Sequence, residues 1–226
     1  MVKVFAGYDP REAIGFSVFV QSLLDHASVP VEIIPTRGDQ RDGTNAFIYA
    51  RFLVPHLCGF KGTAIFLDGA DMLMRADIAE LAALADPHKA VQVVKHDYKT
   101  RHPRKYIGTA LEADNRSYPR KNWSSAIIWN CGHYANRFLT PENVAEATGA
   151  DLHRFAHLPD GLIGELPAEW NCLIGEQDQP SPKIAHFTLG IPAMQHYQDC
   201  QFASEWREVL HKMLNPELST ARKMAA

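Results

Sequence analysis

The chain has 226 residues, 46% of them apolar and 22% charged, and its net charge at pH 7 is −3. These values are ordinary for a globular protein, and a chain of this length can bury roughly 70% of the surface of its unfolded form. A slightly acidic chain has no general attraction to nucleic acid or to an anionic membrane. No apolar run approaches the length of a membrane span. We therefore expect one domain without a transmembrane segment and without a nucleic-acid partner.

Strand and helix patterns alternate in the first half of the chain. The expected strands cover residues 2–6, 31–34, 64–67 and 90–94, and the expected helices cover residues 10–24 and 46–57 and the stretch after Asp77. Asp9 and Pro10 are typical of an N-cap and a first helical position, and Glu12 has the spacing of a capping box. This alternation predicts an α/β fold with a parallel or mostly parallel sheet covered by helices.

The second half of the chain is less regular. Residues 95–118, which we call the basic segment, are polar and predict a long loop. The later elements are a strand at 126–129, a helix at 141–147, a strand at 183–187, an amphipathic helix at 202–213 and a frayed tail from Pro216.

The amino terminus and the cysteines predict a location. Residues 1–5 lead directly into a strand and do not have the pattern of a signal peptide. The four cysteines are scattered and form no Cys-x-x-Cys pair, which is typical of reduced thiols and not of a disulfide framework or a zinc site. We expect a cytoplasmic protein that reaches a membrane only through partners.

The most informative segment is the apolar strand that ends in Asp68 and Asp71. Open α/β sheets bind ligands in the crevice beyond the carboxyl ends of their strands. Two carboxylates there suit a divalent cation, which often accompanies a phosphate. The alternative is a turn or a helix cap, but Asp77 already supplies the cap of the following helix. The segment therefore predicts a metal-dependent enzyme that acts on a phosphorylated donor.

Three further residues are candidates for the same site. His186 ends the late strand, and imidazole suits manganese and other transition metals; the alternative is a hydrogen-bonded core histidine. Gly190 would let a phosphate approach the backbone, or it is part of a plain turn. Arg51 is a good phosphate partner, or a solvated helix residue, or it pairs with Asp68 and neutralises it. The basic run at residues 95–102 could close over an anionic substrate, or it is a solvated surface.

Several segments together resemble a known family. They are Val4-Phe5-Ala6-Gly7-Tyr8-Asp9, Tyr49-Ala50-Arg51-Phe52-Leu53-Val54-Pro55, Phe66-Leu67-Asp68-Gly69-Ala70-Asp71-Met72-Leu73, residues 121–130 and Ala185-His186-Phe187-Thr188. The set resembles the glycosyltransferase family 8-like enzymes of the GT-A fold, which use nucleotide-sugar donors. The segments span most of the chain and occur in the order of that family.

The resemblance implies a GT-A-like single domain over residues 1–226, with a Rossmann-like, mostly parallel central sheet. Residues 1–95 would be the nucleotide-binding half, residues 96–214 the half for the donor sugar and the acceptor, and residues 215–226 a tail. The resemblance implies the following roles: Asp68, Asp71 and His186 hold a divalent metal, Mn²⁺ or Mg²⁺; Ala6, Gly7, Tyr8, Asp9, Arg51 and Gly190 bind the nucleotide; Lys121, Ser124 and Ser125 face the donor sugar.

The reaction implied is transfer of a sugar from a UDP-sugar to a hydroxyl acceptor, with retention at the anomeric carbon. Asp160 is our candidate for stabilising charge on the sugar, and its alternative role is a helix cap. The chain departs from the family pattern in two places near the phosphates. Two residues separate Asp68 from Asp71 where the family usually has one, and the usual Lys-Pro-Trp after the late histidine is absent.

Two other functions stay open from the residues. A sugar-phosphate nucleotidyltransferase has a similar core, but it would have a glycine-rich basic loop after the first strand. A catalytically inactive nucleotide-sugar-binding domain would also fit the altered motifs. A dinucleotide dehydrogenase is disfavoured because no Gly-x-Gly-x-x-Gly follows the first strand.

Overall fold

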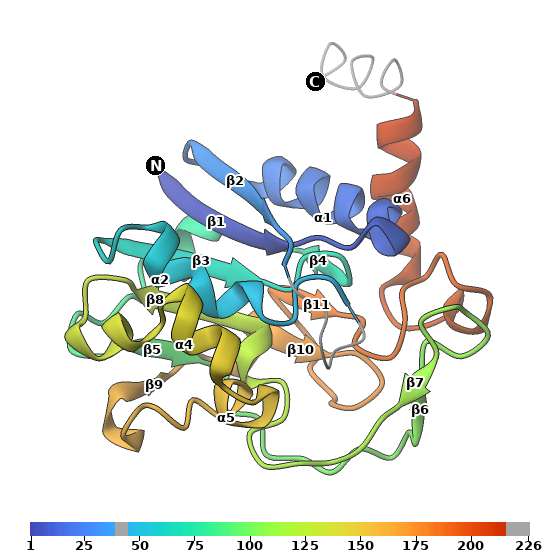
Figure 1. Ribbon diagram of the computed structural model, residues 1–226. Coiled ribbons are helices and arrows are strands. Elements are labelled where there is room, and N and C mark those ends of the chain that lie inside the picture. Colours follow the sequence, from blue (N-terminus) through green and yellow to red (C-terminus); the bar gives the residue numbers. More distant parts are fainter. Residues whose placement is uncertain (39–44, 216–226) are drawn as a thin grey trace.

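The computed structural model describes residues 1–38 and 45–215 (Figure 1). Its strands are β1 (Val2–Gly7), β2 (Val31–Thr36), β3 (Thr63–Leu67), β4 (Met72–Met74), β5 (Val91–Val93), β6 (Arg104–Lys105), β7 (Ala113–Asp114), β8 (Ala126–Asn130), β9 (Ile163–Glu165), β10 (Cys172–Leu173) and β11 (Ile184–His186). Its α-helices are α1 (Ala13–His26), α2 (Val54–Leu57), α3 (Ile78–Ala82), α4 (Pro141–Glu146), α5 (Gly149–His153) and α6 (Ala203–Leu214). The tail predicted from Pro216 lies outside the described residues.

Short 3-10 helices connect several of these elements. They are η1 (Pro10–Glu12), η2 (Ala50–Leu53), η3 (Trp123–Ser125), η4 (Tyr134–Phe138), η5 (Asp160–Leu162), η6 (Ala168–Asn171) and η7 (Gln195–Tyr197). The helix predicted over residues 46–57 is therefore only η2 followed by α2. Pro55 lies in the first turn of α2, where its missing N–H costs no hydrogen bond.

The main sheet has six strands in the order β2-β1-β3-β8-β5-β9. β1 is parallel to β2 and β3, and β5 is parallel to β9. β8 runs antiparallel to both of its neighbours, β3 and β5. The prediction of an α/β fold with a mostly parallel sheet is confirmed. The antiparallel strand in this sheet is β8.

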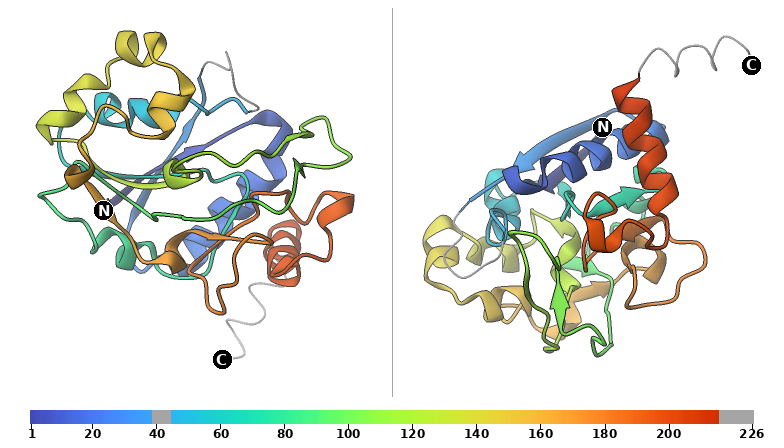
Figure 2. Two further views of the ribbon diagram at one scale, coloured as in Figure 1. Left: turned by 90° about the horizontal axis from the view of Figure 1, so that it is seen from below. Right: turned by 90° about the vertical axis from the view of Figure 1, so that its right-hand side faces the viewer.

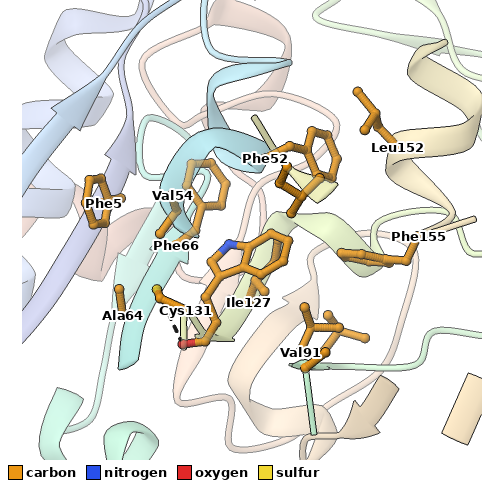
Figure 3. Packing of buried hydrophobic residues seen from close by; sticks show 14 of the residues in the cluster. Phe5, Phe52, Val54, Ala64, Phe66, Val91, Ile127, Cys131, Leu152 and Phe155 are labelled. Carbon is orange, nitrogen blue, oxygen red and sulfur yellow. Dashed lines mark hydrogen bonds between the residues drawn. The ribbon is translucent and has the colours of Figure 1, made fainter. Parts of the chain in front are cut away.

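Helices cover both faces of this sheet, so its central strands are buried on both sides. Alternate residues of β3 enter different clusters: Phe66 lies in the cluster that contains residues of α2, α4 and α5, and Ile65 and Leu67 lie in the cluster that contains residues of α1 and α3. Figure 1 shows α2, α4 and α5 on the near side of the sheet. Figure 3 shows Phe66 with Phe5, Ile127 and Phe155 in the first of these clusters.

A second sheet of three short strands, in the order β10-β11-β4, brings the late part of the chain to the carboxyl end of β3. In its register His186 lies opposite Met72, the residue that follows Asp71. The Phe187 N–H also donates to the Asp71 carbonyl at 2.7 Å. β4 and β10 are too short to show a period in the sequence, and we did not predict them.

The basic segment is not a featureless loop, because it contains the small hairpin of β6 and β7. Figures 1 and 2 show this hairpin, in green, away from the main sheet and beside the orange segment that follows β11. Two hydrogen bonds join these segments, from the Tyr106 N–H to the Leu189 carbonyl and from the Ile107 N–H to the Tyr197 hydroxyl. Within the described ranges, no helix is both long enough and apolar enough to cross a bilayer.

Candidate metal and nucleotide site

A tight turn after β3 directs both aspartates toward one point. The Ala70 N–H donates to the Asp68 carbonyl at 2.8 Å, and the Met72 N–H donates to the Gly69 carbonyl at 2.9 Å. Gly69 has a φ of 73°, a conformation that favours glycine, and a Cβ there would lie 3.2 Å from the Gly7 carbonyl oxygen. This turn accommodates the additional residue between the aspartates.

Asp68, Asp71 and His186 come together at this edge of the sheet. One ligand atom from each side chain lies within 4.8 Å of the others. The His186 Nε2 atom is 3.2 Å from Asp71 Oδ2 and 4.0 Å from Asp68 Oδ2. These residues, far apart in the sequence, meet because β4 follows Asp71 directly and pairs with β11.

A buried asparagine fixes the orientation of the His186 ring. The Asn171 amide nitrogen donates to Ser125 Oγ at 2.8 Å and to the Asn122 carbonyl at 3.3 Å. Its Oδ1 is therefore the acceptor for His186 Nδ1, 2.9 Å away, which must carry a proton. Burial lowers the pKa of His186, but the negative charge of Asp71 outweighs it and raises that pKa, so Nε2 also carries a proton and donates to Asp71 Oδ2 when no cation is bound. A cation would take the place of this proton between Nε2 and the two carboxylates, as in histidines that bind metals. We did not predict Asn171, because no sequence pattern marks a supporting residue of this kind.

The two carboxylates have different surroundings. Burial raises the pKa of Asp68 to about 6, although the Arg51 guanidinium, with Nη1 2.7 Å from Asp68 Oδ1, opposes the rise. Burial also raises the pKa of Asp71, but the neighbouring His186 outweighs it and holds that pKa below its ordinary value. Asp71 Oδ1 is buried and has no hydrogen-bond partner in the part of the chain that the structure describes. Such an atom is costly unless a ligand binds it.

These observations fit a divalent cation. Two carboxylates and one imidazole nitrogen that faces them are a donor set typical of such ions. Asp71 Oδ1 gives the cation an oxygen that no residue of the described ranges binds. Asp68, Asp71 and His186 are the residues that would hold it.

Arg51 is buried and is committed to the protein. Its Nη1 contacts Asp68 and donates to the Ser124 carbonyl at 2.7 Å, and its guanidinium carbon lies 5.5 Å from the ring centre of Phe47 and 5.0 Å from that of Phe66. Of the roles left open by the sequence, the structure shows the pair with Asp68, and the solvated helix residue is wrong because Arg51 is buried. A contact between Arg51 and a nucleotide stays a prediction.

The residues predicted to hold the nucleotide lie at the end of β1, next to the metal candidates. The Ala6 carbonyl accepts from Thr36 Oγ1 at 3.0 Å, and the Tyr8 ring packs edge-on against Phe16. Gly7 allows a close approach, because a Cβ there would lie 2.6 Å from the Asp68 carbonyl oxygen. The end of β1 is therefore held against the aspartate turn.

Asp9 caps η1 as predicted and also fixes a neighbouring segment. Its carboxylate accepts from the Arg11 N–H and from the Ala46 N–H, both at 2.9 Å. Burial raises the pKa of Asp9, but these bonds and the Arg11 guanidinium outweigh it and leave the pKa lowered.

The capping-box role expected of Glu12 is wrong. Its carboxylate makes no bond to the Asp9 N–H; the side chain is only 2% exposed, and its Oε1 atom has no hydrogen-bond partner among the described residues. Burial and the negative charge of Asp71 raise the pKa of Glu12 to about 8. Glu12 turns inward because η1, not an α-helical turn, follows Asp9.

The residues predicted to face the donor sugar precede β8 and are largely buried. Lys121 Nζ donates to Asn115 Oδ1 and to the Arg116 carbonyl, and burial lowers the pKa of Lys121 to about 8. Ser124 Oγ lies 2.6 Å from His153 Nδ1. Ser125 Oγ donates to the Asn122 carbonyl at 2.7 Å.

Two predicted residues lie outside the Asp68–Asp71–His186 cluster. A Cβ on Gly190 would lie 2.3 Å from the Tyr197 ring, so ring packing by itself requires a glycine there. The Asp160 side chain is 83% exposed and pairs with Arg120 Nη2 at 2.5 Å. The structure does not bring either residue into the cluster, and their roles stay predictions.

The basic segment reaches the cluster through a residue that we did not predict. The Tyr106 hydroxyl donates to Asp71 Oδ2 at 3.3 Å, and the ring is buried. The hydrogen bond from the Tyr106 N–H to the Leu189 carbonyl holds Tyr106 in this position. The basic segment therefore contacts the cluster at Asp71.

Solved structures identify the fold. The chain is similar to the bifunctional glycosyltransferase WbbM, with a TM-score of 0.67 and 16% identity over 92% of this chain and 49% of WbbM. It is also similar to glycosyltransferase GlyE of Streptococcus pneumoniae, with a TM-score of 0.60 and 14% identity over 97% of this chain and 64% of GlyE. It thus spans about half of WbbM and slightly less than two thirds of GlyE.

A third similar structure matches the chain over nearly its whole length. It is galactosyltransferase LgtC in complex with donor and acceptor sugar analogues, with a TM-score of 0.60 and 13% identity over 93% of this chain and 96% of LgtC. The protein therefore has the GT-A glycosyltransferase fold, as predicted.

Sequence comparison gives the family. No protein-family model matches the chain. Protein CDI of Arabidopsis thaliana is 41% identical over 222 residues, which cover 90% of this chain and 84% of that protein. The chain belongs to the family of Protein CDI.

Proposed function

We propose that this protein is a metal-dependent glycosyltransferase that moves a sugar from a UDP-sugar to a hydroxyl acceptor with retention at the anomeric carbon. The observation that carries the proposal is the convergence of Asp68, Asp71 and His186 at the carboxyl end of β3. The GT-A fold supports it, since open α/β sheets bind ligands at this edge.

A bound divalent cation would neutralise the diphosphate of the donor and act as a Lewis acid on the leaving group. The imidazole ligand favours Mn²⁺ over Mg²⁺, because imidazole is a better ligand for transition metals. The protein prepares this site before any ligand binds. Arg51 fixes the Asp68 carboxylate, and Asn171 keeps the proton of His186 on Nδ1. Burial of Asp71 and His186 excludes water and strengthens these electrostatic interactions.

The predicted ligand contacts can be divided between the two sides of the cluster. Residues 6–9 and Arg51 would bind the nucleotide, and Lys121, Ser124 and Ser125 would form the donor-sugar side. Two contacts support this division: Arg51 donates to the Ser124 carbonyl, and the Asp68 N–H donates to the Ser125 carbonyl at 2.9 Å. The sequences that precede β8 and follow β3 are therefore joined beside the metal candidates.

The test is release of UDP from UDP-glucose and UDP-galactose, with Mn²⁺ and with EDTA. We expect Mn²⁺-dependent release by the native protein and its loss in the double variant Asp68→Ala, Asp71→Ala. Glu146→Ala, at an exposed carboxylate of α4, is the control and should keep the native rate. Full activity of the double variant would reject the metal role, and pyrophosphate release from a nucleoside triphosphate would indicate a nucleotidyltransferase instead.

Asp160 has a separate test. If its carboxylate stabilises charge on the sugar, Asp160→Asn should lower kcat by about 100-fold, as other losses of transition-state stabilisation do. An unchanged kcat would leave Asp160 with its surface pair to Arg120 as its role.

A further inference from the structure

Two lysines near the cluster differ in how their charge is used. The Lys121 ammonium donates to Asn115 and to the Arg116 carbonyl. Lys105, at the end of β6, has a partly buried side chain and makes no hydrogen bond or ion pair with any residue in 1–38 or 45–215. An ammonium that loses water without gaining a partner is unfavourable. Lys105 is therefore the lysine that is available to an anion.

The position of Lys105 beside the cluster is fixed by the next residue. Tyr106 contacts Asp71 through its hydroxyl, and its N–H donates to the Leu189 carbonyl at 2.6 Å. The Lys105 Nζ atom lies 5.0 Å from the centre of the Tyr106 ring. Tyr106 therefore contacts Asp71 through its hydroxyl and the Lys105 ammonium through its ring.

The negative charges that act on Lys105 are those of two metal candidates, Asp71 and Asp68, and of Glu12. Burial lowers the pKa of Lys105, and the carboxylates of Asp71, Asp68 and Glu12 oppose that change. A divalent cation held by Asp68 and Asp71 would take up most of their negative charge. The ammonium would then lack a counter-charge, and a diphosphate beside the cation would supply one.

The segment that follows His186 has no cation of its own. It contains no lysine or arginine before Arg207. The basic segment is bonded to it through Leu189 and Tyr197. The hairpin of β6 and β7 therefore brings a lysine to a segment that has none.

We propose that Lys105 binds the diphosphate of the nucleotide donor and stabilises the nucleoside diphosphate as it leaves. The inference rests on the proposed function. It assigns the task to a lysine of the basic segment, and it gives Tyr106 the role of positioning that lysine over the cluster.

The experiment compares UDP with UMP, because only the diphosphate should gain from this contact. Affinities for both nucleotides are measured by calorimetry with Mn²⁺ present for the native protein, Lys105→Gln, Lys105→Met and Lys105→Arg. Lys61→Gln is the matched control, an exposed lysine that precedes β3 at the end opposite Asp68. Thermal melting of each variant verifies that it folds.

We expect Lys105→Gln and Lys105→Met to bind UDP about tenfold or more weakly and UMP within about threefold of the native protein, as loss of one charge-assisted contact predicts. Lys105→Arg should retain UDP binding within about threefold, and Lys61→Gln should match the native protein. Equal losses for UDP and UMP, or an unchanged affinity for UDP, would overturn the role of Lys105 and leave the proposed function intact.

Two further outcomes separate the remaining explanations. If Lys105 only balances the carboxylates, its neutral variants will bind Mn²⁺ more tightly without changing the ratio of UDP to UMP affinity, or will fail to fold; either result overturns the proposal. If the native protein binds neither nucleotide, the proposed function itself fails, and the inference fails with it.

Discussion

The acidic cluster and the basic segment meet at Asp71, but different forces hold them in place. Backbone pairing between β4 and β11 puts His186 beside Asp71, and the turn at Gly69 aims the aspartates. The regular backbone pairing of the basic segment is the short β6–β7 ladder; a few turn bonds, the backbone bond from Tyr106 to Leu189 and several side-chain bonds hold the rest. Glu176 accepts from Asn115 Nδ2 at 3.2 Å, from the Arg101 N–H at 3.3 Å and from Thr100 Oγ1.

This difference teaches which changes each region should tolerate. The cluster sits on a rigid sheet edge, so loss of one ligand should remove its chemistry and leave the fold. The basic segment is held by a few buried polar bonds, so loss of one of them should make this segment more mobile and leave the metal ligands in place.

Asp71→Asn should have the largest effect. The amide keeps the shape of the side chain but removes the charge that the cation and His186 both face. We expect Mn²⁺-dependent release of UDP to fall by about a thousandfold or more, with circular dichroism of the fold unchanged. Native activity in Asp71→Asn would show that this carboxylate is not part of the working site.

Asn171→Ala should have the next largest effect, on metal affinity. Without Asn171 Oδ1 the His186 ring loses its fixed proton and orientation. Loss of such a hydrogen-bond partner of a metal-binding histidine typically lowers metal affinity by about 10–100-fold. Asn136→Ala is the matched control, because Asn136 is also buried and bonds two backbone carbonyls, of Ala90 and Asn130. It should lose stability and keep its Mn²⁺ affinity; equal losses in both variants would contradict a specific role for Asn171.

Glu176→Gln should act on the basic segment. Removing a buried charged acceptor of this network should lower the free energy of unfolding by about 1–3 kcal/mol, measured by urea denaturation. Affinity for UDP should fall, because Tyr106 and Lys105 lose their rigid support, but affinity for Mn²⁺ alone should not. A loss of Mn²⁺ binding would mean that the two regions are not separable in this way.

Glu12→Gln should have the smallest effect, and it should depend on pH. The folded-state pKa of Glu12 is raised from 4.5 to about 8, so the folded protein holds this proton more tightly than the unfolded chain does. The stabilising contribution is full below pH 4.5 and is lost as pH rises toward 8. In metal-free buffer at pH 8 the variant should be more stable than the native protein by at least about 1 kcal/mol.

Glu146→Gln, at an exposed residue of α4, is the control for that experiment. It should follow the native protein across the pH range. A constant difference between Glu12→Gln and the native protein from pH 5 to pH 8 would show that Glu12 is not held in its neutral form.

The sequence was sufficient to predict the sheet and the convergence of the three candidate ligands. Asp68 follows a buried strand and His186 ends another, and strand ends in such folds share one edge. The sequence could not predict the roles of Asn171, Glu12 and Tyr106, for a physical reason. Their roles depend on contacts made across the fold. The short strands β4 and β10, which adjoin Asp71 and Asn171, also show no period in the sequence.

The central claim is that Asp68, Asp71 and His186 form one metal site. The most direct measurement is titration of the protein with Mn²⁺ in the presence of UDP, followed by electron paramagnetic resonance of the free ion. We predict that the native protein binds one Mn²⁺ per chain and that His186→Ala weakens this binding by about 100-fold or more. Absence of binding by the native protein, or equal binding by His186→Ala, would contradict the account.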